Sequence, residues 1–207
     1  MTELARPLVS ATQRLERSSS LDGLRRVYTV VSGPVDRWSG SELLRSGLIG
    51  HALHPLLTDL PIGCWTAASV LDLRGRPEDR EASRWLVGAG LAAVGPTALT
   101  GLAEFGRAGR EAQRVGALHG ALNVVATTLY VASFVARTRR RHTLGVAAAL
   151  AGAAVTGVSG YLGGHLTVAR KVGSRDPAYG LDTLGPSSGR HDGPEPLEPV
   201  TGPGALT

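Results

Sequence analysis

The chain has 207 residues, of which 43% are hydrophobic and 4% aromatic, with 28 glycines and a formal net charge of +5. Both ends are polar, so the apolar residues are concentrated in the middle, and a core of Ala, Gly, Val and Leu suits close helix contact in lipid better than a soluble interior. The single cysteine, Cys64, excludes an intrachain disulfide and a four-cysteine metal cluster, while arginines spread through the flanks without interleaved aromatics argue against nucleic-acid binding and fit a lipid bilayer.

Residues 1–46 carry apolar residues at roughly helical spacing with arginines between them. The apolar positions are Leu15, Leu21, Leu24, Val27 and Val31. This pattern predicts a peripheral amphipathic N-terminal segment of one or two helices on the membrane surface. A partly disordered lead-in is the alternative.

Four apolar blocks follow within residues 47–166. They cover residues 48–71, 85–103, 115–136 and 143–165, and each is long enough for a helix to cross about 30 Å of hydrocarbon. The connectors are short and charged, so neighbouring spans must run antiparallel. We therefore predict an all-α fold, an integral membrane antiparallel four-helix bundle.

Two further features concern the last span and the tail. Small residues recur every fourth position in the span, which predicts tight packing of this helix; the rows are Gly145, Ala149, Ala153, Gly157 and Gly152, Thr156, Gly160, Gly164.

Residues 167–207 are first basic and then rich in Pro, Gly and acid, which predicts a disordered tail from about residue 176.

Four histidines fall at the ends of spans that share one leaflet. His51 and His54 open the first span, His119 lies near the start of the third, and His165 closes the fourth. Because an even number of crossings returns the chain to its starting side, all four are expected in one layer, with Glu104 beside them. Ionisable groups within spans are costly and usually mark function.

This layer predicts a metal or haem site with His51, His54, His119 and His165 as ligands. Neutral imidazoles with a carboxylate suit a transition metal, and haem b would take one of His51 and His54 together with His119 or His165 as its axial pair. Thr58 shares a helix face with His51 and His54, and Asp59 flanks it. We expect Thr58, Asp59 and Glu104 to orient imidazoles or to relay protons.

Two prolines shape the first span. Pro55 is tolerated in the first helical turn, where no N–H partner is needed. Pro61 lies further in and predicts a kink that frees the carbonyl of Leu57, which another helix or a water must then satisfy.

Other functions remain open at this point. The histidines could cap helix ends or bridge helices; His54, Asp59 and Glu104 could relay protons in a proton-coupled transporter or channel component; or the chain could be a non-catalytic membrane anchor or assembly subunit. An enzyme acting on its own is disfavoured because no nucleophile lies beside a base.

The runs GLIGHALHPLLTDLPIGCWTAASVLDL and SGYLGGHLTVARKVG resemble a bacterial family of small four-helix membrane proteins, the domain of unknown function twenty-two thirty-one, and the similarity covers about residues 12–175. The matching positions are Gly50, His51, Leu53, His54, Pro55, Thr58, Asp59, Pro61, Ile62, Gly63, Trp65, Leu71 and Asp72, then Gly160, Tyr161, Gly163, Gly164 and His165. The resemblance implies a multi-pass protein of the bacterial inner membrane with no assigned activity.

Members of that family are often joined to, or accompanied by, a Rieske-type [2Fe–2S] domain, which implies electron transfer. Such a centre needs two cysteines, so here the Rieske-type or other redox partner must be a separate polypeptide. The arginines of residues 1–26 break an otherwise even charge distribution and favour cytoplasmic termini. The oligomeric state is left open.

Overall fold

The computed structural model describes residues 6–45 and 47–176, and these residues are almost entirely helical. They contain no strand, and the one β-type contact among them is an isolated antiparallel bridge between His51 and Arg175. The predicted all-α class is confirmed. Most of the predicted disordered tail, from residue 177 onward, lies outside the described residues.

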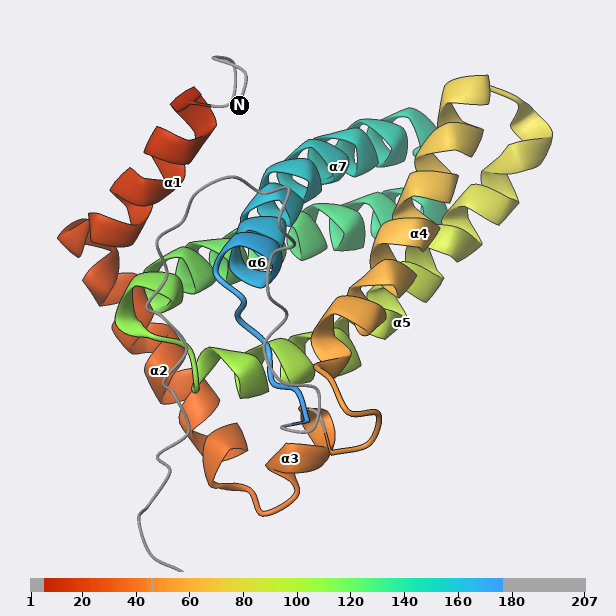
Figure 1. The fold of residues 1–207 in the computed structure, drawn as a ribbon. Helices are drawn as coiled ribbons and strands as arrows, with labels where there is room; N and C mark the ends of the chain where they lie inside the picture. Colours follow the sequence, from red (N-terminus) through yellow and green to blue (C-terminus); the bar gives the residue numbers. More distant parts are fainter. Residues whose placement is uncertain (1–5, 46, 177–207) are drawn as a thin grey trace, which may run out of the picture. The chain divides into compact units, whose positions relative to one another are not determined.

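Four long helices form the body of the described chain. They are α4 (Leu53–Arg74), α5 (Arg80–Phe105), α6 (Arg110–Thr138) and α7 (His142–Gly164). All four are long and apolar enough to cross a membrane, and they correspond to the four predicted spans. Figure 1 shows them alternating in direction along the chain.

The helix ends differ from the apolar blocks for local reasons. α4 begins at Leu53 rather than at residue 48, which places Pro55 in the first turn as expected. α5 and α6 reach back into their charged connectors, to Arg80 and Arg110, because long charged side chains can extend from a helix end toward water. A short 3₁₀ turn, Pro77–Asp79 (η3), joins α4 to α5.

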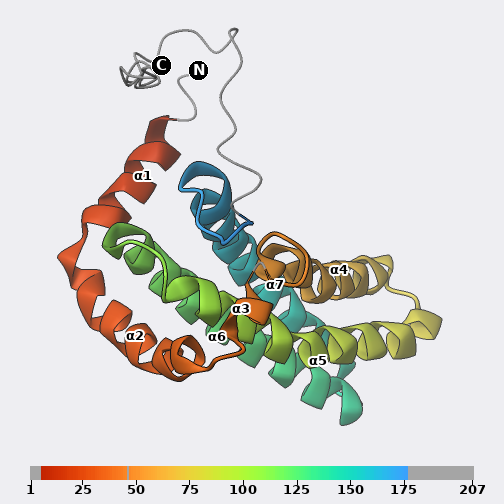
Figure 2. The same cartoon turned by 60° about the horizontal axis from the view of Figure 1, so that its bottom comes forward.

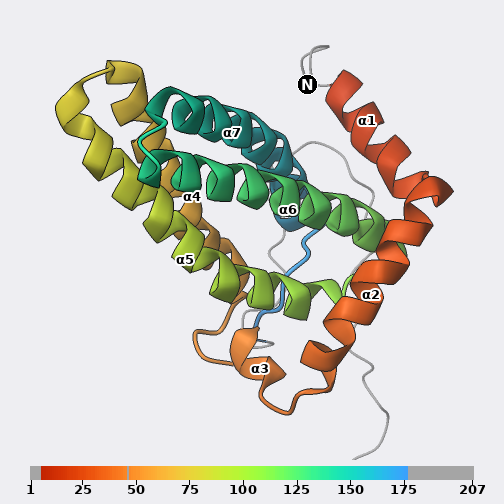
Figure 3. The ribbon, with the colours of Figure 1, turned by 180° about the vertical axis from the view of Figure 1, so that it is seen from behind.

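The four helices pair as two hairpins, α4 with α5 and α6 with α7. Both pairs are seen side by side in Figures 1 and 3. In the first hairpin the Trp65 indole N–H donates to the Val87 carbonyl at 3.3 Å. In the second, the Ser133 hydroxyl donates to the Gly145 carbonyl at 2.7 Å. Each side-chain bond crosses between the two helices of its own hairpin.

The two hairpins are structural repeats of each other. Residues Ala52, Leu53 and His54 of the first have the counterparts Ala117, Leu118 and His119 in the second, 65 positions later. The same shift of 65 relates three pairs of residues that contact each other between α4 and α6, so each of these residues meets its own counterpart. The pairs are His54 with His119, Trp65 with Tyr130, and Asp72 with Arg137. Contacts of this kind arise when two units are related by an approximate two-fold axis along the bundle.

The second helices of the hairpins follow the same relation with a shift of 62. Gly90 of α5 lies against Trp65, and its counterpart Gly152 of α7 lies against Tyr130. Val87 and its counterpart Ala149 are both fully buried in one core cluster with these two aromatic rings. The centre of the bundle is therefore a stacked ring pair held between two small-residue helix faces.

The small-residue rows of α7 do not all face the bundle. Gly145, Ala149 and Gly152 are buried, whereas an added Cβ at Gly157, Gly160 or Gly164 would meet nothing within 4 Å. A row of every fourth residue drifts about 40° per step around a helix of 3.6 residues per turn. A long row therefore leaves the interface, and these two rows pack closely only in the first half of α7.

The N-terminal segment is helical and lies against the ends of α5 and α6. It consists of α1 (Arg6–Arg17), a 3₁₀ turn (Ser19–Leu21, η2), α2 (Asp22–Arg37) and the short α3 (Ser41–Leu44). Figure 2 shows α1 and α2 curving around the end of α6. Val27, Val30 and Val31 of α2 are exposed, as expected of an amphipathic helix with an apolar outer face.

Candidate functional site

His54 lies in the first turn of α4 and is held against α5. Its Nδ1–H donates to the carbonyl of Thr97 at 3.0 Å. The facing residue is Gly101, where a Cβ would come within 2.8 Å of His54 Cε1. Glycine at this position therefore makes room for the imidazole, and the carbonyl fixes its orientation.

His119 repeats this arrangement in the second hairpin. Its Nδ1–H donates to the Ser159 carbonyl of α7 at 2.8 Å, and a Cβ at Gly163 would come within 3.1 Å of its Cε1. Its Nε2 also has a partner, since the Asn123 amide donates to it at 3.0 Å. The Ser159 hydroxyl donates in turn to Asn123 Oδ1 at 2.6 Å.

The two imidazoles face each other across the bundle axis. Their ring centroids are 6.4 Å apart and their planes are nearly perpendicular, at 86°. Each Nδ1–H donates to a carbonyl, so the neutral form of each ring carries its lone pair on Nε2. The geometry brings together two nitrogen ligands of one kind, from two helices, near one end of the bundle.

His51 and His165 do not join this pair. His165 begins the π-helical turn His165–Ala169 (η4), and its Nε2 lies 2.7 Å from the Glu16 carboxylate of α1. His51 precedes α4 and is exposed, pairing through its backbone with Arg175. No group of three or more His, Cys, Asp or Glu residues is placed to hold a metal ion within the described chain. The expected convergence of four ligands is therefore not seen. His165 instead pairs with Glu16 of α1, a helix that lies outside the four spans.

Within the described residues, none of the three predicted supporting residues forms a hydrogen bond with the imidazole pair. Asp59 is exposed on the outer side of α4, and the Thr58 hydroxyl donates to the Pro55 carbonyl at 2.6 Å. Glu104 is buried and accepts both the N–H and the hydroxyl of Ser174, at 2.8 and 2.7 Å. It fastens the segment after η4 to the end of α5.

The carbonyl that Pro61 frees has a partner on another helix, as predicted. The Leu57 carbonyl, which loses its helical partner to the proline, accepts the Thr97 hydroxyl of α5 at 3.2 Å. Thr97 thus serves α4 twice, through its hydroxyl at Leu57 and through its carbonyl at His54. The same residue that satisfies the Leu57 carbonyl also orients the imidazole.

At the opposite end of the axis is a buried ion pair that the sequence did not single out. Arg137 and Asp72 are both 1% exposed and are joined by two bonds of 2.5 and 2.9 Å. Ser83 donates to the Asp72 carboxylate at 2.7 Å, and the Arg137 Nε–H donates to Ser133 at 3.0 Å. The guanidinium and the carboxylate therefore have partners on several sides. The shift of 65 residues, rather than any local motif, is the signal that could have found this pair.

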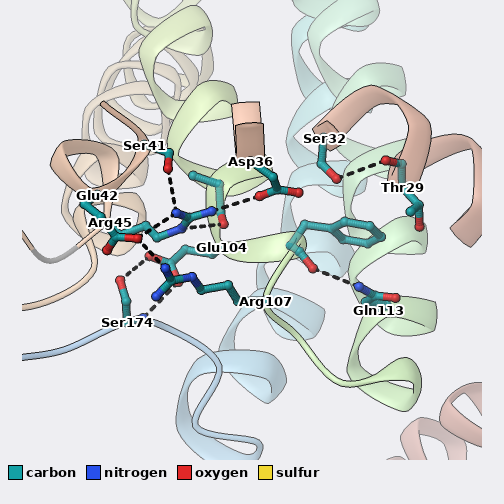
Figure 4. A network of polar contacts seen from close by, with 12 residues as sticks. Thr29, Ser32, Asp36, Ser41, Glu42, Arg45, Glu104, Arg107, Gln113 and Ser174 are labelled. Carbon is teal, nitrogen blue, oxygen red and sulfur yellow. Dashed lines mark hydrogen bonds and ion pairs between the residues drawn. The ribbon is translucent and has the colours of Figure 1, made fainter. Parts of the chain in front are cut away.

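A second polar network ties the N-terminal helices to the end of α5 (Figure 4). Arg45 is 3% exposed, donates to the Ala103 carbonyl at 3.0 Å and pairs with Asp36 at 2.8 Å. Glu42 accepts from Arg45 and from Arg107 of the α5–α6 connector. Arg45 thereby satisfies a carbonyl at the end of α5 that would otherwise lack a partner.

Two carboxylates of the N-terminal helices are acidified by their arginine partners. Asp22 pairs with Arg114 at 2.8 Å and with Arg110 at 2.9 Å, and these guanidinium groups, Arg114 first, hold its pKa well below its usual range. Arg170 binds the Glu16 carboxylate, and this contact lowers the pKa of Glu16 against the opposing effect of burial. Both acids are therefore ionised at neutral pH.

The chain matches the model of one protein family, described as "Predicted membrane protein (DUF2231)", over residues 50–176. Comparison with curated proteins and with solved structures gave no match. The matched stretch contains both hairpins, with the imidazole pair and the buried ion pair, and it excludes α1, α2 and α3. It covers more than half of the sequence and agrees with the resemblance found from the residues. The chain therefore belongs to the DUF2231 family of predicted membrane proteins.

Proposed function

We propose that the chain is a membrane electron-transfer module that holds haem b, or else a single transition-metal ion, between His54 and His119. The observation that carries this proposal is the matched pair of Nδ1–H bonds to the carbonyls of Thr97 and Ser159. Histidines that bind metals usually donate their other ring N–H to a carbonyl or carboxylate, which fixes the tautomer and the ring. Here that arrangement occurs twice, on two imidazoles that face each other.

The donor set fits haem better than a bare ion. Haem b can be held by two histidines, and His54 and His119, from separate helices, would supply those two nitrogens. A protein zinc or copper site usually takes three or four side-chain ligands, and the described residues offer no third one near the pair. Gly101 and Gly163 have no Cβ that would press against the two rings. The two-ligand group is therefore the first candidate.

When bound, the group supplies one-electron exchange, and the residues of the chain do the rest. His54 and His119 provide the ligating nitrogens, while Thr97 and Ser159 hold those rings in place through their carbonyls. The Trp65–Tyr130 stack, with centroids 3.8 Å apart, fills the axis at the next level. The redox partner is a separate protein, for which a Rieske-type protein is the expectation from the resemblance.

We also propose that the protein lies in the bacterial inner membrane with both termini in the cytoplasm, because the arginines of residues 1–26 break an otherwise even charge distribution.

The alternative of a proton relay through His54, Asp59 and Glu104 has less support. Asp59 is exposed on the outside of α4, and Glu104 is occupied by Ser174.

The test is a spectrum and an elemental analysis of the full chain, purified in detergent from haem-competent, metal-replete cells. We expect a Soret band that shifts on reduction, at about one haem per chain, and its loss in both His54→Ala and His119→Ala. His142→Ala is the matched control, since His142 opens α7 at the other end of the bundle, and it should keep the band.

Two other results of the spectrum and the elemental analysis would change the assignment. A stoichiometric transition metal without a Soret band would assign the site to an ion. A folded preparation that is colourless and free of metal would overturn the proposal and leave an anchor or assembly subunit, in which the two histidines only fasten helices.

A further inference from the structure

The two hairpins differ at the position four residues after each histidine. Asn123 of α6 donates to His119 Nε2 at 3.0 Å. Its counterpart in α4 is Thr58, which bonds to the Pro55 carbonyl of its own helix instead. Within the described residues, no hydrogen bond reaches the Nε2 of His54. The pair is therefore symmetric in its rings and asymmetric in the availability of its lone pairs.

We propose that Asn123 is the specificity-determining residue of the imidazole pair, because it decides whether His119 can act as a ligand. This inference rests on the proposed function. While the Asn123 amide occupies Nε2, only His54 has an available lone pair, and ligation is single. When the amide turns away, both nitrogens become available, and a group that needs two axial imidazoles can be held.

Further hydrogen bonds hold the Asn123 side chain in a fixed position against His119. Its Oδ1 accepts the Ser159 hydroxyl at 2.6 Å, and the Ser159 carbonyl accepts His119 Nδ1–H at 2.8 Å. Asn123, Ser159 and His119 thus form a closed set of bonds between α6 and α7. Releasing Nε2 requires at least the amide–imidazole bond to break, so ligand binding competes with one hydrogen bond.

The experiment exchanges the two positions in the full chain and titrates the cofactor-free protein in detergent with haemin. Asn123→Thr copies the first hairpin into the second. One lost competing hydrogen bond corresponds to about a three- to tenfold gain in affinity. We also expect a larger fraction of six-coordinate, low-spin haem, which is the spectroscopic signature of two imidazole ligands.

The reciprocal change tests the same idea from the other side. Thr58→Asn places an amide four residues after His54, and we expect affinity and the low-spin fraction to fall by a similar factor. Asn123→Val removes the amide in a second way, in case the threonine variant folds poorly. Thr128→Asn is the control, because Thr128 is exposed on α6 and bonds only to the Val124 carbonyl.

The outcomes separate the two proposals. Wild-type binding that is unchanged in Asn123→Thr, Asn123→Val and Thr58→Asn overturns the role of Asn123 and leaves the proposed function standing. If neither the wild type nor any variant binds haemin, and a parallel titration with Co²⁺ is also negative, the proposed function fails and this inference fails with it.

Discussion

The two hairpins, α4–α5 and α6–α7, share a scaffold and differ in chemistry at equivalent positions. Where the axis passes between His54 and His119 the residues are identical, and between Trp65 and Tyr130 they are similar. Between Asp72 and Arg137 they are opposite in charge. A residue near a two-fold axis meets its own counterpart, so a charged residue can stand there only if the counterpart changes sign, because two like charges at this distance in a low-dielectric interior repel strongly.

The difference shows how two similar hairpins can be made to pair with each other rather than with copies of themselves. The ion pair is complementary only between the first hairpin and the second, so it favours their mutual pairing over pairing of either hairpin with a copy of itself. The imidazole pair carries no such information. One end of the axis therefore specifies which helices meet, while the other end leaves two similar groups available for a ligand.

The largest expected effect comes from breaking the ion pair. Asp72→Ala or Arg137→Ala leaves a buried charge without its partner, which costs about 3–5 kcal/mol. The measurement is the free energy of unfolding in mixed detergent micelles. The double variant Asp72→Arg with Arg137→Asp restores opposite charges, and we expect it to recover a substantial part of the loss.

An exposed ion pair provides the control for that experiment. Arg84 and Glu81 of α5 are 3.4 Å apart, and their side chains are 32% and 75% exposed. Glu81→Ala should change the unfolding free energy by less than about 0.5 kcal/mol. Equal effects at the two pairs would contradict the assignment of pairing specificity to Asp72 and Arg137.

A smaller effect is expected where the second helices pack on the aromatic stack. A Cβ at Gly90 would overlap the Trp65 indole nitrogen, whereas a Cβ at Gly152 would approach Tyr130 Cε2 to 3.0 Å. Overpacking typically costs about 1–3 kcal/mol, so Gly90→Ala should destabilise the protein more than Gly152→Ala. Gly157→Ala, with open space around the new methyl group, should be nearly neutral. Thermal unfolding of the three variants ranks them, and the reverse order would show that the first hairpin is the looser of the two.

The smallest effect is expected at the contact between Glu16 of α1 and Arg170, which follows α7. Arg170 keeps the pKa of Glu16 below its ordinary value of 4.5 in the folded chain. A lowered folded pKa stabilises docking of α1 fully above the unfolded value, and this contribution is lost as the pH falls through the folded value. We expect α1 to remain docked at neutral pH and to be released only in acid, below about pH 4.5.

A spin label on α1 reports this release. A label at Val9→Cys, with Cys64→Ser to remove the native thiol, should become mobile in acid, and Glu16→Gln should already be mobile at neutral pH. A label that stays immobile in Glu16→Gln would show that the carboxylate does not hold α1.

Much of the fold was predictable because it depends on composition and length. The four spans, their alternation and the amphipathic character of residues 1–46 follow from where apolar and charged residues lie. The need for a partner at the Leu57 carbonyl follows from Pro61 alone, although the identity of that partner, Thr97, does not. Such features are local, or depend only on the number of crossings.

The site was predictable only in part. His54 with His119 is one of the expected pairings, since both lie near the same end of their spans. The separation of His165 was not, because its neighbour Glu16 is 149 residues away in a segment without a membrane-spanning pattern. Asn123 and Ser159 carry no motif, and their roles appear only when α6 and α7 are in contact.

The sequence by itself determined that this chain is a four-span helical membrane protein with imidazoles near one end. The length of the apolar segments and the number of crossings decide this, and neither depends on how each helix is rotated about its axis. Only the tertiary structure decided which faces meet. Rotation of each helix about its axis selects whether a polar residue reaches the bundle axis, an adjacent helix or the outside, and it is set by packing of Trp65, Tyr130, Gly90 and Gly152 at the centre. That packing places His54 opposite His119 and Asp72 opposite Arg137, and leaves Asp59 on the outer face.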